Sequence, residues 1–435
     1  MSPINQTGEE TLSTSQSDFA IDTSVQTLST AAAGYWQKLK GGDLGSVPAT
    51  LGIFVLCLFF GATRPKTFLS VYNFGNLLQQ AGPIIAIAVA VSFVLLLGEI
   101  DLAAGFSAGV CAAVVATRLK AGWSLPLALL LGILATLVIG LFTGWLVSKI
   151  GIPSFVVTLA NFLMWQGVVL LITKESGTVR VTDKLIVALD NKNMSVPISW
   201  VLFTLVVGGF ALASLVSASA RRRSGVSTAP VAVIALRTGG LAVLWGIPTL
   251  LFSRNRSPNA NISIKGVPWV VLVVLILVVT LTFLLTRTAW GRHLYAVGGN
   301  AEAARRAGIN VARIRMSAFV MCAVLSGVAG VLLASRLNSV DPQTGGNDFL
   351  LVAVGAAVIG GTSLFGGRGR IVNAVLGGLV LAIIDNGLPL VGELSIFGAF
   401  KVNFSESGIK FIVKGLILLI AASVDALSRK TTASS

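Results

Sequence analysis

The residues in this chain that could do chemistry are a few acids and amides set among long apolar runs. Glu99 and Asp101 follow one apolar run, and Asp385 and Asn386 lie within another. Carboxylates and amides can bind a hydroxylated solute through networks of hydrogen bonds. An amide inside a helix can instead bond to a neighbouring helix, a bond worth about 0.6–2 kcal/mol. Both interpretations stay open for the candidate pathway-lining residues, which are Glu99, Asp101, Asn161, Gln166, Asp385 and Asn386.

The position of each carboxylate within its run bears on this choice. An ionised carboxylate surrounded by hydrocarbon costs several kcal/mol, whereas one at the end of a run can reach water. We therefore expect Glu99 and Asp101 near the inner end of a span, either as gate residues or paired with the amides of the next segment. Asp385 and Asn386 are expected near the outer end of theirs.

Few residues in this chain are candidates for catalysis or metal binding. The chain has one histidine, His293, and three cysteines, Cys57, Cys111 and Cys322, which lie far apart in the sequence. These residues make no recognisable metal motif and no disulfide framework. We expect no catalytic residue, no metal and no cofactor.

A polar loop at 287–313 has the pattern of a short exposed helix after a glycine break at Gly298 and Gly299. Asn300 can accept hydrogen bonds from the free N–H groups that follow it, and Glu302 falls where the helix dipole favours negative charge. Gly308 suits the residue after a helix end. Such a helix is marginal alone and gains order in a partner's groove, although a solvated connector is the alternative. The docking candidates are Gly299, Asn300, Glu302, Ala303, Ala304 and Gly308.

A glycine-rich stretch from Gly360 to Gly369 resembles a phosphate loop only superficially. It lacks the Gly-Lys-Ser/Thr ending that holds phosphate and Mg²⁺, so we expect no ATP site in this chain. Arg368 and Arg370 favour a tight cytoplasmic connection that supports the docking loop, with a plain turn as the alternative. Its residues of interest are Gly360, Gly361, Thr362, Ser363, Gly366 and Gly367.

The elements that must position these residues are membrane helices. The chain of 435 residues is 54% hydrophobic and 11% charged, against about 25% charged in soluble domains. This composition excludes a soluble enzyme and a disordered chain, and the long unbroken runs exclude the alternating pattern of a barrel. We predict an all-α polytopic membrane protein with about 10–12 transmembrane helices, from apolar stretches at about 48–62, 77–97, 102–117, 125–147, 154–172, 199–218, 231–252, 268–286, 314–334, 349–361, 371–388 and 408–427.

Two of these stretches, 102–117 and 349–361, are too short to span a bilayer of about 30 Å. Both contain glycine. Backbone that leaves the helix at membrane depth survives only where protein or water surrounds it. We therefore predict that either could be broken or re-entrant.

The net charge of +15 is interpreted as anchoring at the inner face, since basic residues gather in cytoplasmic loops; no nucleic acid is expected. Twelve spans place four basic clusters on one side, together with both termini: Lys38 and Lys40, Arg221–Arg223, the 287–315 loop, and Arg429 with Lys430. We expect a disordered cytoplasmic tail at 1–46, a transmembrane domain at 47–427 and a cytoplasmic C-terminal tail at 428–435.

Five motifs in order resemble the ribose/xylose/galactose-type sugar permeases of ABC importers. Glu302-Ala303-Ala304 followed by Gly308 is similar to their EAA-x3-G coupling signature. The resemblance covers about residues 50–428, and the extended stretch 199–265 is most similar to the xylose-type members. The other four motifs are Ala81-Gly-Pro-Ile-Ile leading into Glu99-Ile-Asp-Leu-Ala-Ala-Gly105, Pro153-Ser-Phe, the loop Gly360–Gly369, and Asp385-Asn386-Gly387.

The resemblance implies a type II ABC-importer-like permease domain that forms the translocation pathway for a monosaccharide. The length of the chain favours a xylose-like pentose. It implies an ABC ATPase subunit, an extracytoplasmic sugar-binding protein and a second permease copy as a homodimer, in a bacterial plasma (inner) membrane. An ion-gradient-driven secondary transporter of a small polar solute is the alternative. That class needs an ionisable residue at mid-membrane. A membrane-embedded enzyme would need clustered catalytic groups.

Overall fold

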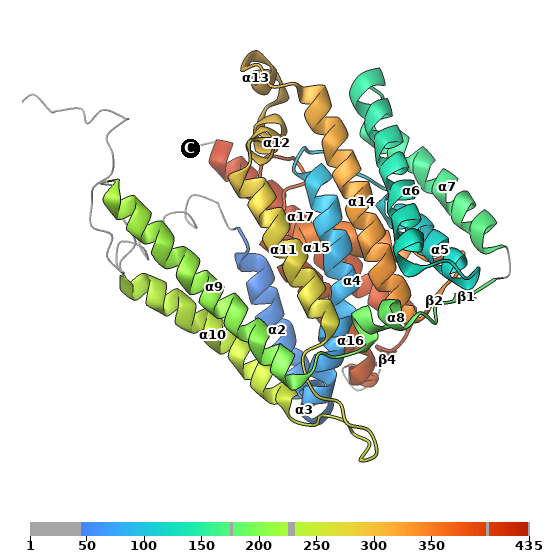
Figure 1. The fold of residues 1–435 in the computed structure, drawn as a ribbon, viewed down its shortest axis with the longest axis vertical. Helices are drawn as coiled ribbons and strands as arrows, with labels where there is room; N and C mark the ends of the chain where they lie inside the picture. The colour runs from blue at the N-terminus through green and yellow to red at the C-terminus, as the bar shows by residue number, and fades with distance from the viewer. Residues whose placement is uncertain (1–44, 175–176, 225–230, 397–399, 434–435) are drawn as a thin grey trace, which may run out of the picture. The chain divides into compact units, whose positions relative to one another are not determined.

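The computed structural model describes residues 45–174, 177–224, 231–396 and 400–433, which are helical almost throughout (Figure 1). Each of the twelve predicted apolar stretches lies on a helix, and the all-α class is confirmed. These helices are α2 (Val47–Thr63), α4 (Val71–Leu95), α5 (Ala104–Lys120), α6 (Leu125–Trp145), α7 (Ser154–Thr173), α9 (Val196–Arg223), α10 (Val231–Ser253), α11 (Trp269–Arg287), α14 (Val311–Leu337), α15 (Asn347–Ile359), α16 (Ile371–Val391) and α17 (Ser407–Ala433).

Eight helices of the described chain are long and apolar enough to cross a membrane. Helix α6 continues without a break into a π-helical turn, η1 (Leu146–Ile150), and the two count as one span. Large apolar side chains stay exposed along the outer helices, among them Leu134 of α6, Leu163 of α7 and Phe283 of α11. Such surfaces suit lipid, because a bilayer is as apolar as the side chains that face it. The eight helices are α4, α6 with η1, α7, α9, α10, α11, α14 and α16.

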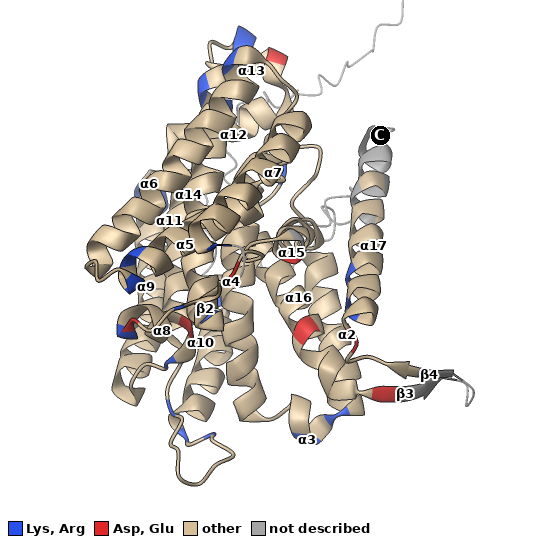
Figure 2. Cartoon of the chain, turned by 90° about the vertical axis from the view of Figure 1, so that its right-hand side faces the viewer, with Lys and Arg blue, Asp and Glu red and all other residues tan. Residues whose placement is uncertain are grey.

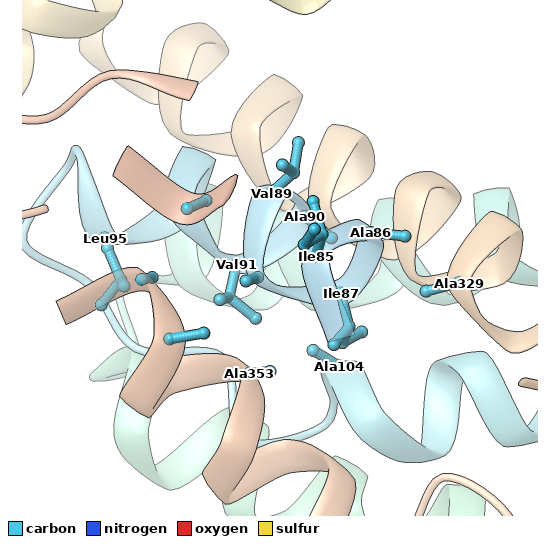
Figure 3. Packing of buried hydrophobic residues seen from close by; sticks show 14 of the residues in the cluster. Ile85, Ala86, Ile87, Val89, Ala90, Val91, Leu95, Ala104, Ala329 and Ala353 are labelled. Atoms are coloured by element: carbon cyan, nitrogen blue, oxygen red, sulfur yellow. The ribbon is translucent and has the colours of Figure 1, made fainter. Parts of the chain in front are cut away.

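Helix α4 forms the centre of the larger compact unit, which comprises the described residues of 38–200 and 248–435. It packs against α14, α16 and α15, and its segment Ile85–Leu95 is almost fully buried. Alanines in this segment allow the helices to approach closely. Figure 3 shows the packing around Ile85, Ala86, Ile87 and Val91, with Ala329 of α14 and Ala353 of α15.

The second compact unit contains residues 201–247, from most of α9 and α10. Its two helices approach where Gly246 lies, since a Cβ added there would be 3.3 Å from the ring of Phe203. This unit coincides with most of the extended stretch 199–265. Arg221–Arg223 are exposed in the last turn of α9.

The short helices α5 and α15 each follow a non-helical stretch, at 96–103 and at 341–346. The first turn of α5 is buried. The stretch before α15 meets that first turn, because a Cβ added to Gly345 would lie 2.1 Å from the carbonyl oxygen of Gly105. Only glycine permits this approach of two backbones. The structure thus places non-helical backbone beside each of the two short segments that the sequence indicated as broken.

The connections hold short elements, among them two antiparallel strand pairs. Val179 pairs with Val340 across β1 (Val179–Arg180) and β2 (Ser339–Val340). The other pair is β3 (Glu393–Ile396) with β4 (Phe400–Asn403). The remaining short helices are α3 (Pro65–Phe68), α8 (Lys184–Asn191), α12 (Ala289–Gly299) and α13 (Ala301–Arg306).

The predicted tails fall largely outside this description. The tail at 1–46, with Lys38 and Lys40, lies outside the described residues up to position 44. At the other end, α17 continues to Ala433, beyond the boundary expected at 427.

Candidate functional site

The predicted docking loop folds into the paired helices α12 and α13. The Asn300 side chain accepts hydrogen bonds from the backbone N–H groups of Glu302 (3.1 Å) and Ala303 (3.0 Å). The Glu302 carboxylate pairs with Arg305 at 2.8 Å and with Arg306 at 3.3 Å. These exposed pairs contribute little stability, so the cap at Asn300 is the main local reason why the helix begins there.

The end of α13 also follows the sequence pattern. Gly308 has a φ of +84°, which favours glycine, and its N–H donates to the carbonyl of Arg305. Ala304 is buried, whereas Ala303 is exposed. Figure 2 shows α12 and α13 at one end of the larger unit, where basic residues gather on α13. A short capped helix with a charged outer face is therefore presented to solvent.

The interpretation of Gly298 and Gly299 as a helix break was wrong, because α12 continues through both residues. A Cβ on Gly298 would lie 1.8 Å from the carbonyl oxygen of Leu96. Gly298 is thus needed for close contact between α12 and the end of α4. The helix ends instead at Asn300, whose extended backbone begins the cap of α13.

The glycine-rich loop joins this contact and forms what we call the inner junction, made of Leu96, Tyr295, Gly298, Gly367 and Gly369. The Gly367 N–H donates to the Leu96 carbonyl at 2.8 Å, and the Tyr295 hydroxyl donates to the Gly369 carbonyl at 2.7 Å. Burial raises the pKa of Tyr295, so this hydroxyl stays a donor at neutral pH. The junction connects α12, α4 and the loop before α16.

The rest of the glycine-rich loop is compact. Thr362 and Ser363 are buried, and the Thr362 N–H donates to the Ala357 carbonyl at 2.9 Å. Gly366 approaches the same junction, because a Cβ there would lie 2.8 Å from the Gly298 carbonyl oxygen. Gly360 and Gly361 begin the loop directly after α15 and lie close to Asn373 of α16. The loop is therefore a packed connection between α15 and α16.

Glu99 and Asp101 differ in burial and contact different parts of α14. Glu99 is 3.5 Å from Arg315, close to the end of α14 that adjoins α13. Asp101 accepts hydrogen bonds from the Ala103 N–H at 2.9 Å and from the Cys322 thiol. Cys322 comes seven residues after Arg315 on α14, which is about 10 Å along the helix.

Asp101 is the more buried of the two carboxylates, at 5% exposure against 16% for the Glu99 side chain, and the expectation that both lie near the inner end of a span stays a prediction. The backbone turns inward at Gly98, whose φ is +75°. The carboxylate is held beside the first N–H groups of α5, at Ala103 and Ala104, where the helix terminus supplies donors. A buried carboxylate is tolerated there because hydrogen-bond donors replace water.

The other pathway candidates contact different helices. Asn386 of α16 and Asn73 of α4 exchange two hydrogen bonds, of 2.8 and 3.0 Å. Asn161 of α7 donates to the Thr143 hydroxyl of α6 at 2.8 Å, and Asp385 is 2.6 Å from the ammonium of Lys414 on α17. These are the helix-to-helix bonds of the alternative interpretation.

Gln166 lies half-buried on α7, one residue after Trp165. The ring of Trp165 packs edge-on against Phe142, with 6.3 Å between the ring centroids. Trp165, one turn after Asn161, therefore shares its side of α7, which faces α6. Glu99 and Asp101 contact α14, and Asn161 contacts α6. Asp385 and Asn386 contact α17 and α4, so among the described residues these contacts assemble no single cluster.

Sequence reasoning missed a polar group around Asp190 of α8. Its carboxylate is fully buried and lies 3.7 Å from Arg336 of α14, which donates to Asn76 of α4 at 3.0 Å. Gln79 donates to the Asp190 carbonyl at 2.6 Å. Burial raises the pKa of Asp190 to about 7, and the charge of Arg336 opposes this shift. The available signal was Asp183, which caps an amphipathic segment in the 173–198 loop.

Comparison with known proteins decides the class. Residues 73–422 match the family described as the branched-chain amino acid transport system permease component. The chain belongs to this permease family. The permease is 32% identical to the xylose transport system permease protein XylH of Escherichia coli (strain K12). The alignment spans 405 residues, which are 93% of this chain and 97% of the relative. No solved structure matches the permease.

Two further relatives extend the comparison. The XylH protein of Haemophilus influenzae is 30% identical over 394 residues, 90% of this chain and 99% of its own. The ribose import permease protein RbsC of Bacillus subtilis is 30% identical over 375 residues, 86% of this chain and 91% of its own. The resemblance to sugar-type permeases drawn from the five motifs is confirmed. The chain is a multi-pass membrane permease and not itself an enzyme.

Proposed function

We propose that this permease is the membrane-spanning subunit of an ATP-driven importer for a monosaccharide, a pentose such as xylose. The observation that carries the proposal is the near full-length similarity to permeases named for xylose and ribose transport. Its partners are an ABC ATPase, an extracytoplasmic sugar-binding protein and a second copy of the permease. The membrane is a bacterial plasma (inner) membrane, with both termini and the basic loops in the cytoplasm.

The coupling element in this proposal is α13 with its cap, at Gly299, Asn300, Glu302, Ala303, Ala304 and Gly308. The charged side chains of Glu302, Arg305 and Arg306 are exposed, as a helix that enters a partner's groove requires. Behind α13, the inner junction ties α12 to the end of α4 and to the glycine-rich loop. Movement of α13 would therefore reach the buried centre of the permease through packed backbone rather than flexible side chains.

The translocation pathway in this proposal includes Glu99 and Asp101, which follow α4 and precede the interior start of α5. A solute that passes this point would meet carboxylate oxygens, which accept hydrogen bonds from sugar hydroxyls. Gln166 and Asp385 are further proposed contacts, whereas Asn161 and Asn386 are occupied by interhelical bonds in this conformation. The domain that carries the pathway is 47–427, between the tails at 1–46 and 428–435.

A gradient-driven transporter of a small polar solute is the second candidate. The observation that favours it is the burial of Asp101, which is 5% exposed and contacts α14 at Cys322. A buried carboxylate is what proton- or Na⁺-coupled transport uses. Family membership favours the ATP-driven importer.

The test is uptake and ATPase capture by the reconstituted permease. Glu302→Lys reverses the charge that pairs with Arg305 and Arg306, and Gly308→Leu places a side chain at φ +84°. We expect each variant to retain at least tenfold less ATPase subunit on co-purification and to lose ATP-dependent xylose uptake. The matched control is Glu406→Lys, which reverses an exposed acid before α17 and should change neither.

Unchanged ATPase capture and uptake in both variants would contradict the coupling assignment. Xylose uptake by the permease alone, driven by a proton or Na⁺ gradient and indifferent to ATP and the ATPase, would favour the second candidate. In that case, Asp101→Asn should abolish the dependence on the gradient.

A further inference from the structure

A cavity of about 310 Å³ lies where α13 ends and α14 begins. It is lined by Ser148 of η1, Arg305 of α13, residues 309–312 and Arg315 of α14. Its walls thus come from η1 and from the connection between α13 and α14, which is distant from η1 in the sequence. None of these residues belongs to the translocation candidates or to the inner junction.

The cavity contains hydrogen-bond donors that lack acceptors. The Ser148 hydroxyl and the Arg315 Nε are buried and have no hydrogen-bond partner among the residues that the structure describes. The first N–H groups of α14 have no partner within their own helix; the Asn310 side chain accepts that of Arg313, at 3.0 Å. A buried donor without an acceptor is costly. An acceptor-rich ligand would satisfy all of these groups together.

The charge of the cavity selects an anion. Glu99 pairs with one terminal nitrogen of Arg315, and Glu302 pairs with one terminal nitrogen of Arg305. A guanidinium has five N–H donors, so each arginine keeps others for a ligand. A serine hydroxyl, a helix N-terminus and two guanidinium groups are the donor set that binds a phosphate group. Lys149, which is exposed and follows Ser148 directly, adds positive charge next to the cavity.

The surroundings of the cavity indicate where the phosphate comes from. Trp145 and Ile150, which flank Ser148 in the chain, are 49% and 51% exposed. They continue the exposed apolar surface of α6 up to the edge of the cavity. Tryptophan is enriched at membrane interfaces, and basic pockets between helices at the cytoplasmic surface bind anionic head groups. An acyl chain could therefore lie along α6 while its phosphate enters the cavity.

We propose that this cavity binds the phosphate of an anionic phospholipid and thereby ties α13 to η1 and the start of α14. The inference needs this end of α14 to lie at a membrane surface, and it is independent of the sugar and of the ATPase. The bound lipid would hold Arg305, which belongs to α13, and would limit the movement of that helix.

The test measures lipid retention by the full-length chain, purified in mild detergent, with native mass spectrometry. Phosphatidylglycerol, phosphatidylcholine and inorganic phosphate are titrated separately. Ser148→Asp places a carboxylate in the cavity, and Arg315→Gln removes one guanidinium. Arg313→Gln is the matched control, because this exposed arginine lies two residues before Arg315 and outside the cavity.

We expect one phosphatidylglycerol to bind the unaltered chain and the control at least tenfold more tightly than either cavity variant. Phosphatidylcholine should bind the unaltered chain no more tightly than it binds the cavity variants. Inorganic phosphate at millimolar concentration should not displace phosphatidylglycerol. The melting temperature offers a second readout, since phosphatidylglycerol should raise it for the unaltered chain and the control alone.

Equal retention of phosphatidylglycerol by all four proteins would overturn the proposal. Equal protection by inorganic phosphate would assign the cavity to a free anion instead of a lipid. Loss of ATPase capture in Ser148→Asp, without any change in lipid binding, would make the cavity part of the ATPase docking surface and would likewise overturn it.

Discussion

Replacing Asn386 with leucine tests whether this amide joins helices or contacts the transported solute. Asn386 and Asn73 are both buried and exchange two hydrogen bonds, of 2.8 and 3.0 Å. Leucine branches at the same position as asparagine, is larger and cannot hydrogen-bond. The Asn386→Leu variant therefore removes both bonds and leaves the Asn73 carbonyl without its partner.

The size of the effect follows from the number of bonds. The Asn73 amide nitrogen also donates to the Phe68 carbonyl at 3.1 Å, so only its oxygen is orphaned in Asn386→Leu. One orphaned buried acceptor costs about 1–3 kcal/mol of unfolding free energy. The coupling energy is smaller, because interhelical bonds in membrane proteins average about 0.6 kcal/mol each. Two bonds predict about 1.2 kcal/mol between Asn73 and Asn386.

The assay is a double-mutant cycle of Asn73→Leu and Asn386→Leu on the purified chain. Unfolding is followed in mixed micelles as the fraction of sodium dodecyl sulfate is raised. A parallel cycle on Asn161 and Thr143, with leucine and valine, provides the control. That pair has a single bond of 2.8 Å, which predicts about half the coupling energy, roughly 0.6 kcal/mol.

Two results would refute this reasoning. A coupling energy for Asn73 and Asn386 no larger than that for Asn161 and Thr143 would show that the two hydrogen bonds do not each add to the coupling energy. Loss of uptake in Asn386→Leu, with unfolding free energy unchanged, would instead make this amide a contact of the solute.

The remaining predictions concern burial and close packing. Burial raises the pKa of Asp190 from 3.8 to about 7, so between these pH values the folded chain keeps a proton that the unfolded chain has lost. The melting temperature should therefore fall as the pH rises from about 4 to 7, and Asp190→Asn should remove this dependence on pH. Gly298→Ala should cost about 1–3 kcal/mol of unfolding free energy, because the new Cβ meets the Leu96 carbonyl at 1.8 Å. Its neighbour is the control: a Cβ on Gly299 meets no other residue within 4 Å, so Gly299→Ala should be neutral or should stabilise α12 by about 0.5–1 kcal/mol. Equal costs for the two alanines, or the same pH slope in Asp190→Asn, would count against these assignments.

Features that depend on neighbouring residues in the chain could be predicted from the sequence. The twelve apolar stretches form helices because a helix satisfies its own backbone hydrogen bonds without water. The docking helix follows from Asn300, Glu302 and Gly308, which act on backbone groups within one or two turns. The shortness of 102–117 and 349–361 could be read from the length of each apolar run, and the structure shows each as a short helix, α5 and α15, preceded by non-helical backbone.

Only the tertiary structure decided which distant groups meet. Asn73 and Asn386 are 313 positions apart in the sequence. The sequence pattern predicted a helix break at Gly298, whereas the structure shows that the absence of a side chain there permits close contact with Leu96. The burial of Asp101 depends on how the chain turns at Gly98 beside α14, and the cavity at Ser148 and Arg315 needs three elements to converge. Helix formation is governed by bonds between residues four apart, whereas burial, ion pairs and cavities depend on which faces pack together. The sequence by itself therefore determined a helical membrane permease with a capped helix at 301–306, and the packing of α4 and α14 determined what surrounds each polar group.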